Sequence, residues 1–560
     1  MKIFKKIIMV AGVAGLVATS CNKKFDSMLE NPNQPLPAQA DADLYVNQIQ
    51  LSFPGYFDAV QSFGAEFTRQ SAFTGANYTN GYSPQSYSGT WSSAYTSIVK
   101  NADALIELAA PRRQTYHVGI AYILKGYTMM TMVDCFGDVP YTEANKGNAN
   151  TNPKLDPGKN VYNAAIALLD SGIANMGRTP STNVANDMYY GHLSSTATRR
   201  AAWATLAKTL KLRAYLNLRL SDAAAATAGI NALITGGDLI DTDAEDFTFR
   251  YGTQLANPNT RHPRYNDGYR ASGGAGGYIG TYFMHAIAVE KILLGQPRDP
   301  RREFYFYRQA FAPGSQAQQP CAYNAAPGHY GPDDPFCYTL SGHWGRDHGD
   351  NSGIPPDGAQ RTVWGIYPAG GKFDDVSITA VGINDGAKGA GIHPIWMSWF
   401  TDFTLMEAGI TLSGVNLTPA QEKAYFVSGI NKNMARVFGY GATVGLSIPS
   451  SALTTAASRQ TTYVNGMSNL WDAAATDAAK LDLGLKEYYL TTWGNGIESW
   501  NMYRRTSRPR ALQPMLVASP GAFIRSFYYP ADFANLNTNG SQKAGPGVKV
   551  FWDTNPDALF

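Results

Sequence analysis

Apolar side chains recur at helical spacing through much of the first 235 residues. The segment from Trp91 places apolar side chains at Tyr95, Ile98, Ala102, Leu105, Ile106 and Ala109. This spacing follows the i, i+3, i+4 rhythm of a helix with one buried face. Three later segments repeat it, with apolar side chains at Ile120, Ile123, Leu124, Tyr127 and Met130, at Tyr162, Ile166, Leu169 and Ile173, and at Trp203, Leu206, Leu210, Ala214 and Leu218. The pattern predicts helix-on-helix packing for this part of the chain.

The four predicted helices form two antiparallel pairs joined by short or moderate loops. Such packing resembles tetratricopeptide stacking, although the repeat period is irregular. We therefore expect a mostly α fold, in which residues 41–246 form a tetratricopeptide-like helical scaffold.

The helical pattern stops between residues 247 and 394. This stretch contains the run Gly273-Gly274-Ala275-Gly276-Gly277 and one predicted helix around Tyr282 to Leu294. Long irregular segments are usually functional or disordered, and the many aromatic residues here argue against disorder. We expect a loop-rich insert that contacts a ligand or partner.

Helices resume in the last part of the chain, residues 395–560. One is predicted near Trp399 to Leu412, and the next begins at Thr418, with Pro419 in the first turn and Gln421 completing a capping box. The final stretch, Gly521 to Phe560, is predicted to be extended. The three parts together are expected to close into a single domain.

The N-terminus has the anatomy of a lipoprotein signal peptide. Three lysines (Lys2, Lys5 and Lys6) precede the apolar stretch Ile7 to Val17, and small residues lead to Cys21. The apolar core is about eleven residues long, too short to span a bilayer. We expect residues 1–20 to be removed, Cys21 to be lipidated, and residues 21–40 to form a proline-containing tether.

Three other cysteines remain. Cys321 and Cys337 flank a loop rich in proline and glycine, and an envelope location permits disulfides, so we expect these two to be bridged. Cys135 lies among Met130, Met132 and Phe136 and is expected to be a buried free thiol.

The composition favours uncharged ligands over nucleic acid. Charged residues make up 16% of the chain and the formal net charge is +3, which gives no strong field for nucleic acid. Aromatic residues make up 12%, including 33 tyrosines. Aromatic faces with amide and hydroxyl groups suit sugars, which stack on rings and form many hydrogen bonds.

The common catalytic motifs are absent from the sequence. It contains no H-E-x-x-H, G-x-S-x-G or phosphate-loop motif, so we expect no enzyme activity and no cofactor. His343, Asp347, His348 and Asp350 contain metal-ligand types, but a solvated turn is the favoured interpretation, and we expect no metal site. Two carboxylates that meet in space could still form a hydrolase, and that alternative stays open.

Three motifs identify a family resemblance. Val133-Asp134-Cys135-Phe136-Gly137-Asp138-Val139-Pro140-Tyr141-Thr142-Glu143-Ala144 resembles the F-G-D-V-P-Y-x-E-A signature of the SusD/RagB family. Glu498-Ser499-Trp500-Asn501-Met502-Tyr503-Arg504-Arg505-Thr506 resembles its E-x-W-x-x-Y-R-R-T segment, and the ends around Arg525 to Pro530 and Val550 to Asp553 resemble its closing elements.

This resemblance implies an outer-membrane lipoprotein that captures oligosaccharide and passes it to a TonB-dependent SusC-like barrel. The RagB branch implies a peptide-binding lid as the alternative. The motif residues themselves suit a structural role: Asp138 can satisfy backbone donors at a turn, and Arg504, Arg505 and Arg525 can hold the terminal segment against the helices.

Candidate ligand-binding residues come from two regions. The loop after the opening helix contributes Arg69, Asn77, Tyr78, Asn80, Tyr82, Tyr87 and Trp91, and the irregular region contributes Tyr265, Tyr269, Tyr330, Trp344 and Trp364. Binding residues concentrate on loops that a rigid scaffold positions. Among these, Trp344 is the preferred candidate because polar and glycine-rich sequence surrounds it.

Overall fold

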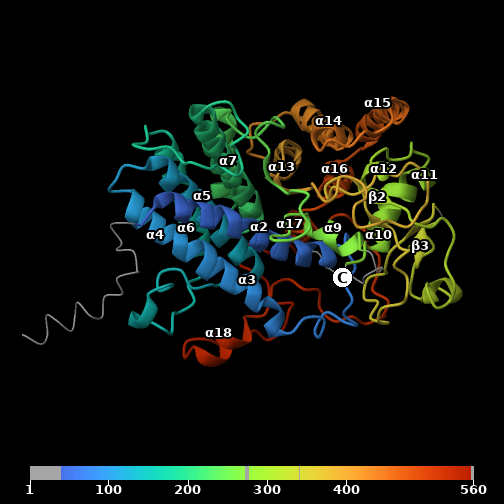
Figure 1. The fold of residues 1–560 in the computed structure, drawn as a ribbon, viewed down its shortest axis with the longest axis horizontal. Coiled ribbons are helices and arrows are strands. Elements are labelled where there is room, and N and C mark those ends of the chain that lie inside the picture. Colours follow the sequence, from blue (N-terminus) through green and yellow to red (C-terminus); the bar gives the residue numbers. More distant parts are fainter. Residues whose placement is uncertain (1–39, 271–276, 340, 557–560) are drawn as a thin grey trace, which may run out of the picture.

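The computed structural model describes residues 40–270, 277–339 and 341–556. The predicted signal peptide, the lipidation site Cys21 and the tether up to residue 39 lie outside these ranges. The fold is mostly helical, as predicted, and its helices form two blocks with a loop-rich region beside them (Figure 1).

The N-terminal block contains all four predicted helices. Its members are α2 (Ala42–Phe67), α3 (Ser88–Ser92), a π-helical segment (Ser93–Val99), α4 (Lys100–Ala109), α5 (Thr115–Phe136), α6 (Gly158–Met176), α7 (Thr196–Asn217) and α8 (Ala223–Gly236). Nearly all of the predicted apolar positions are buried, whereas Ile106, Ile166 and Ile173 are partly exposed. The helix expected from Trp91 begins slightly earlier and runs continuously through α3, the π-helical segment and α4.

The region between residues 247 and 394 contains only short elements. They are β1 (Phe247–Arg250), α9 (Pro263–Gly268), α10 (Thr281–His285), a π-helical segment (Ala286–Glu290), α11 (Lys291–Leu293), α12 (Arg302–Tyr305), β2 (Phe306–Tyr307), β3 (Tyr338–Thr339), β4 (His343–Trp344), β5 (Val363–Trp364) and β6 (Ile392–Trp396). The strands pair antiparallel as β1–β6, β2–β5 and β3–β4. A disulfide joins Cys321 to Cys337 as predicted, and Cys135 is a buried free thiol.

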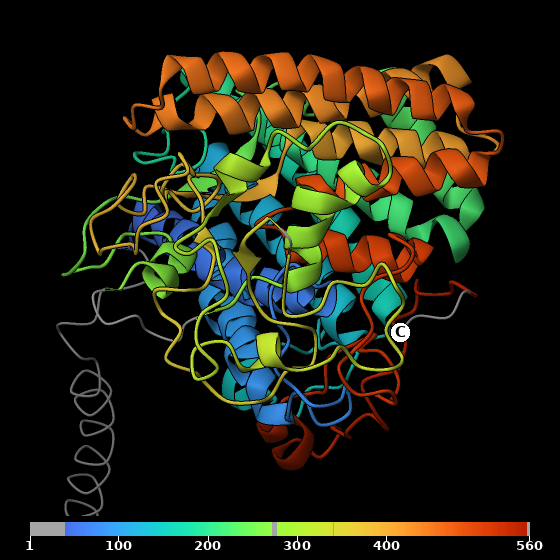
Figure 2. The same cartoon turned by 90° about the vertical axis from the view of Figure 1, so that its right-hand side faces the viewer.

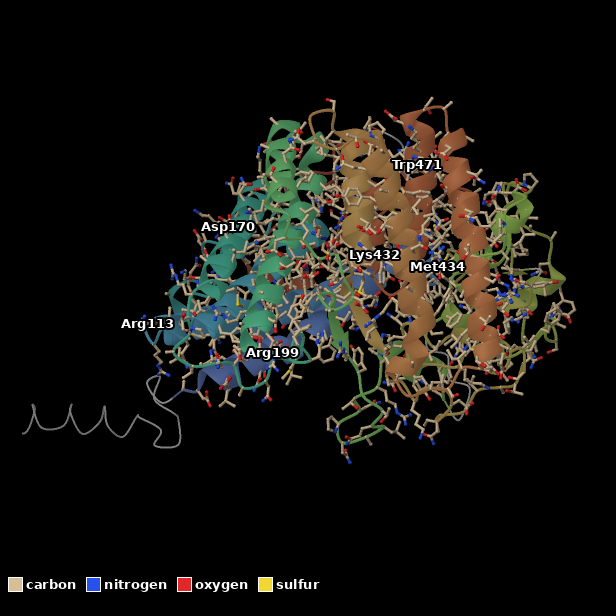
Figure 3. All side chains as sticks on the ribbon, turned by 90° about the horizontal axis from the view of Figure 1, so that it is seen from above. Arg113, Asp170, Arg199, Lys432, Met434 and Trp471 are labelled. Carbon is tan, nitrogen blue, oxygen red and sulfur yellow. A yellow bond between two sulfur atoms is a disulfide. The ribbon has the colours of Figure 1, made fainter. Side chains whose placement is uncertain are left out.

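The C-terminal block contains α13 (Ser398–Thr411), α14 (Pro419–Thr443), α15 (Ser450–Ala473), α16 (Asp477–Thr491) and α17 (Gly496–Thr506). The capping box of α14 forms between Thr418 and Gln421, as predicted. Helices α14 and α15 run alongside each other across the top of the molecule (Figure 2). From above, Asp170 and Arg199 lie on one block, and Lys432, Met434 and Trp471 lie on the other (Figure 3).

The last part of the chain is not wholly extended, which corrects the prediction. Residues Ala531–Leu536 form the short helix α18. Pro530 precedes its first turn, a position where proline costs no hydrogen bond. Its first turn also carries Asp532, which the helix dipole favours there.

Helices α2 and α17 cross in direct backbone contact. A Cβ atom placed on Gly64 would lie 2.2 Å from the carbonyl oxygen of Gly496, and one placed on Gly496 would lie 2.0 Å from the amide nitrogen of Ala65. Glycine at both positions lets the two helices approach more closely than side chains would permit. The first helix of the described chain is therefore joined directly to one near its end.

The family-like motifs form a buried polar network that holds the C-terminal segment. Asp134 accepts hydrogen bonds from Arg213 (2.7 Å), Asn501 (3.0 Å) and the indole of Trp552 (2.9 Å). Arg504 donates to the backbone carbonyl oxygens of Asp134 at 2.8 Å and Arg525 at 2.6 Å.

Two further ion pairs extend this network. Arg525 pairs with Asp553, and Arg505 donates two 2.7 Å hydrogen bonds to Glu407. Asp138 accepts from the backbone amide of Gly158 at 2.7 Å. The structural roles predicted for Asp138 and the three arginines are confirmed.

None of the helices in the three described ranges has a segment long and apolar enough to cross a bilayer.

Candidate ligand-binding hollow

Three segments that are far apart in the sequence lie side by side next to the end of α2. The early loop, residues 70–73, hydrogen-bonds to residues 278–280, and residues 279–281 hydrogen-bond to Arg346. The backbone contacts are Ala72 N to Tyr278 O (2.9 Å), Gly280 N to Gln70 O (3.0 Å), Thr281 N to Arg346 O (2.9 Å), Arg346 N to Ile279 O (3.1 Å) and Gly349 N to Phe73 O (2.8 Å). This backbone pairing fixes the loops relative to one another.

An open hollow of about 390 Å³ lies where these segments meet. Its lining residues are Glu66, Ala72, Thr74, Gly277, Tyr278, Arg346, Asn351, Gly353 and Ile354. Thr74, Asn351 and Ile354 are exposed at the rim, and Ile354 is 70% exposed. The volume suits a small or drug-sized ligand.

Tyr278 and Arg346 form one wall of the hollow. The guanidinium of Arg346 lies 4.5 Å from the centroid of the Tyr278 ring, and that of Arg361 lies 5.2 Å from it, so two cations contact the ring. Arg346 also donates to the carbonyl oxygen of Gly353 and lies 3.8 Å from the carboxylate of Asp350. These contacts hold Arg346 at the edge of the hollow.

Glu66 contributes a carboxyl group from the last turn of α2. Burial raises the pKa of Glu66 to about 8, and the nearby Arg264 opposes that rise. At neutral pH the group is therefore mainly a neutral acid that can donate a hydrogen bond to a ligand.

This raised pKa predicts a pH-dependent stability difference. Between the ordinary pKa of glutamate and about 8, the folded chain holds a proton at Glu66 that the unfolded chain releases, so stability falls as pH rises through that window. Glu66→Gln removes this effect. The melting temperatures of the variant and the wild type should match near pH 4 and differ by roughly 2–5 °C above pH 8, with the variant higher. Equal melting temperatures at both pH values would contradict the raised pKa.

Most of the predicted early-loop candidates are part of the packed interior. Arg69 is buried and donates to the carbonyl oxygens of Gln513 (2.9 Å) and Phe67 (2.7 Å). Tyr78 is also buried, and its hydroxyl lies 3.0 Å from His348 Nε2. Tyr87 stacks on Phe527 with ring centroids 4.3 Å apart. These three side chains connect loops to the core, which corrects their assignment to a ligand surface.

The other early-loop candidates are more accessible. Tyr82 and Trp91 are partly exposed but pack against the core, and Asn77 is partly exposed. Asn80 is exposed, and its backbone amide donates to the side chain of Asn77 at 2.8 Å. None of these four residues lines the hollow.

The candidates of the loop-rich region are also largely covered. Tyr265 and Tyr269 stack on each other with centroids 4.2 Å apart, and Trp364 stacks on Trp493 with centroids 3.6 Å apart. Because their faces are in contact with other rings, these residues are corrected to core positions. Tyr330 is partly exposed and donates to the carbonyl oxygen of Pro514 at 3.3 Å.

Trp344 is 6% exposed, in contrast to the open loop position expected for it. It lies in β4, which pairs with β3 and sets Trp344 opposite Tyr338. Trp344 lines a much smaller hollow of about 30 Å³ next to the first, and the two share Arg346.

The hollow is lined by residues of the early loop and of the middle of the chain, the two regions expected to contribute to a ligand site, but by none of the predicted residues. Glu66, Tyr278 and Arg346 were not predicted. Tyr278 directly follows the glycine run, and Arg346 lies between Trp344 and Asp347. Both residues are therefore sequence neighbours of features that the sequence analysis singled out.

Of the residues considered for a metal, His343, Asp347 and His348 are buried against protein partners, which corrects the solvated turn expected for them. His343 lies 2.8 Å from the Ser341 hydroxyl, His348 contacts Tyr78, and Asp347 accepts from the amide of Cys337 at 2.7 Å. In the described part of the chain, no group of three or more His, Cys, Asp or Glu side chains is arranged to hold a metal ion.

Comparisons with known proteins give a consistent result. Residues 42–343 match the model of the SusD-like family described as starch-binding and associating with the outer membrane. No curated protein sequence is significantly similar to this chain.

Among solved structures, a chitin-binding protein aligns over 93% of this chain and 100% of its own, with 17% identity and a TM-score of 0.63. A SusD/RagB family protein from Bacteroides thetaiotaomicron covers 92% and 100%, with 16% identity and a TM-score of 0.65. A chitin-binding SusD homolog from Flavobacterium johnsoniae covers 90% and 99%, with 16% identity and a TM-score of 0.59. At these identities, the structural matches establish a shared fold.

Proposed function

This chain belongs to the SusD-like family, and from that premise we propose that it binds a glycan in the hollow and leaves it chemically unchanged. The observation that carries the proposal is the junction of the early loop with residues 277–281 and 346–354. It places a tyrosine ring, hydrogen-bonding side chains and backbone groups around one open space. The family description as starch-binding and the two chitin-binding structural relatives support a glycan.

The chemistry of the lining suits a sugar. Thr74 and Asn351 offer a hydroxyl and an amide at the rim, and Glu66 offers a carboxyl group that can donate or accept. Ile354 and the edge of Tyr278 give apolar surface for the carbon-bonded face of a sugar ring. A site with a few polar groups on an otherwise preformed surface is typical of small-ligand binding.

The hollow can be tested with a double variant at its rim. Thr74→Ala combined with Asn351→Ala removes two hydrogen-bonding groups and should weaken glycan binding about 5- to 100-fold. Isothermal titration with maltoheptaose and chitohexaose measures the affinity, and an unchanged melting temperature shows that the fold is intact.

The matched control is Asn80→Ala, which truncates an exposed asparagine of the same early loop outside the hollow. Its affinity should stay within about two-fold of the wild type, since a solvated side chain without a ligand contributes nothing to binding. A double variant that binds as tightly as the wild type, or a loss confined to Asn80→Ala, would place the ligand elsewhere.

The same titration distinguishes the alternatives left open by the sequence. Heat from a peptide panel without heat from glycans would support the peptide-binding lid. Turnover of the glycan, lost when one carboxylate is changed, would support a hydrolase.

We also propose that Cys21 carries the lipid anchor and that a SusC-like TonB-dependent barrel receives the glycan. Support comes from the signal-peptide pattern and from the family description, which associates these proteins with the outer membrane. Cys21→Ser should move the protein from the membrane fraction to the soluble fraction. Extraction of the wild type with a mild detergent should co-purify a large barrel protein. Recovery of the monomer alone, from cells that express a SusC-like barrel encoded by a neighbouring gene, would contradict the pairing.

A further inference from the structure

Three arginine side chains converge on one carboxylate oxygen of Glu303. None of these four residues lines the hollow. Nη2 of Arg298 and Nη2 of Arg302 each lie 2.9 Å from Oε1 of Glu303, and Nη1 of Arg459 lies 3.2 Å from the same atom. Arg298 precedes α12, Arg302 and Glu303 are its first two residues, and Arg459 belongs to α15. Figure 1 shows α12 beneath α15 at the edge of the molecule.

The charges of this cluster do not balance. Three guanidinium groups face one carboxylate, which leaves a net charge of about +2 at neutral pH. Other charged groups of the same segment are already paired: Arg308 donates to Asp374 at 2.7 Å, and Asp299 accepts from Arg301 at 2.9 Å. Among the described residues, Glu303 is the carboxylate that pairs with each of the three arginines, so the excess charge stays with them.

The pKa values of Arg298 and of the neighbouring His343 are lowered, as expected near an excess of positive charge. Burial and then the adjacent Arg302 lower the pKa of Arg298. Burial, followed by Arg302 and Arg308, lowers the pKa of His343 well below its usual range. Both shifts agree in direction with a local excess of positive charge.

The cluster also has donor capacity that the protein does not use. The side chain of Arg302 is 8% exposed, and its buried Nε has no hydrogen-bond acceptor in the described part of the chain. The side chains of Arg298 and Arg459 are 30% and 41% exposed, so solvent reaches the outer part of the cluster. A buried guanidinium donor normally has an acceptor, so this Nε is available to bind one.

We propose that Arg298, Arg302 and Arg459 bind the oxyanion group of a small ligand, namely a sulfate, phosphate or carboxylate. Guanidinium groups suit planar or tetrahedral oxyanions because they present paired donors. The ligand is small because the three guanidinium groups meet at one atom and the innermost is nearly enclosed. The site shares no residue with the hollow and does not depend on the proposed glycan binding.

The experiment measures binding of sodium sulfate, sodium phosphate, glucose 6-sulfate and unmodified glucose to the wild type at constant ionic strength, with chloride as the balancing anion. Titration calorimetry and thermal shift report the affinity. We expect saturable binding of the charged probes and none of glucose. Tighter binding of glucose 6-sulfate than of sulfate would identify a charged sugar as the ligand, and equal binding would identify the free anion.

Two variants move the affinity in opposite directions. Arg298→Gln with Arg459→Gln removes two accessible cations and should weaken binding at least about 10-fold. Glu303→Gln removes the carboxylate that competes with the ligand and should strengthen binding roughly 3- to 10-fold. The control is Arg510→Gln, an exposed arginine paired with Asp482 at 2.9 Å, which should leave the affinity unchanged.

The proposal fails if no charged probe shows saturable binding to the wild type. It also fails if the double arginine variant, shown to be folded by its melting curve, binds as the wild type does. Because Glu303→Gln keeps all three arginines, a weaker affinity in this variant would likewise overturn the site.

Discussion

Replacing Asp134 with asparagine should destabilise the protein by about 3–5 kcal/mol, one of the largest effects expected of a single substitution. Asp134 is fully buried, with Arg213 and Asn501 at one carboxylate oxygen and Trp552 at the other. Asparagine preserves the shape but offers one acceptor oxygen and one NH₂ group. Either the Arg213 and Asn501 donors or the Trp552 indole N–H would then face the NH₂ group, which is also a donor. The buried Arg213 would keep only Glu498 as its charge partner.

The free energy of unfolding from urea or guanidinium titration measures this effect. Asp170→Asn is the matched control, because it makes the same chemical change at an exposed residue of α6 that pairs with Lys211 (Figure 3). An exposed pair contributes roughly 0.2–1 kcal/mol, so the control should stay close to the wild type. Similar small losses in both variants would show that the buried network is not a main source of stability.

Two glycines of α2 should respond in opposite directions to the same substitution. Gly64→Ala places a methyl group 2.2 Å from the carbonyl oxygen of Gly496, so α2 and α17 would have to separate, at a cost of about 3 kcal/mol. Gly55 lies on the exposed side of the same helix with no atom within 4 Å of an added Cβ. Gly55→Ala should therefore stabilise the protein by roughly 0.5–1 kcal/mol, through the lower backbone entropy of the unfolded chain.

Chemical denaturation of the two variants, compared with the wild type, gives both values. Because both changes add one methyl group to one helix, any general effect on helix propensity is shared. Destabilisation of equal size at Gly55 and Gly64 would contradict the close crossing of α2 and α17.

The parts of the fold that were predictable are those set by local sequence. Helix α5 was predicted because its apolar positions and the stop at Gly137 lie within one segment, and the start of α14 because Thr418, Pro419 and Gln421 are neighbours. The Cys321–Cys337 pairing was also predictable, since the two residues close a loop with a sequence separation of 16. The structural role of Arg504, Arg505 and Arg525 was predictable for the same reason, because each lies within a short, recognisable motif.

The site was predicted less well because ring exposure depends on distant partners. The hydroxyl of Tyr78 lies next to His348, which is 270 positions away in the sequence, and Trp364 is covered by Trp493. A single sequence does not reveal such pairs. The two-loop site was expected from loops on a rigid scaffold and from the family resemblance. The lining residues Tyr278 and Arg346 depend on backbone pairing between segments that only the fold brings together.

The crossing of α2 with α17 also has a consequence for the order in which the chain becomes structured. Gly64 of α2 packs against Gly496. The hydroxyl of Tyr489 donates a hydrogen bond to the carbonyl oxygen of Thr68, at the end of α2, at 2.7 Å. Helix α2 therefore completes its packing only after almost the whole polypeptide has been synthesised. Contacts with such large sequence separation form slowly. A truncated chain that stops before α17 should remain incompletely packed throughout, even though every helix of its N-terminal block is present.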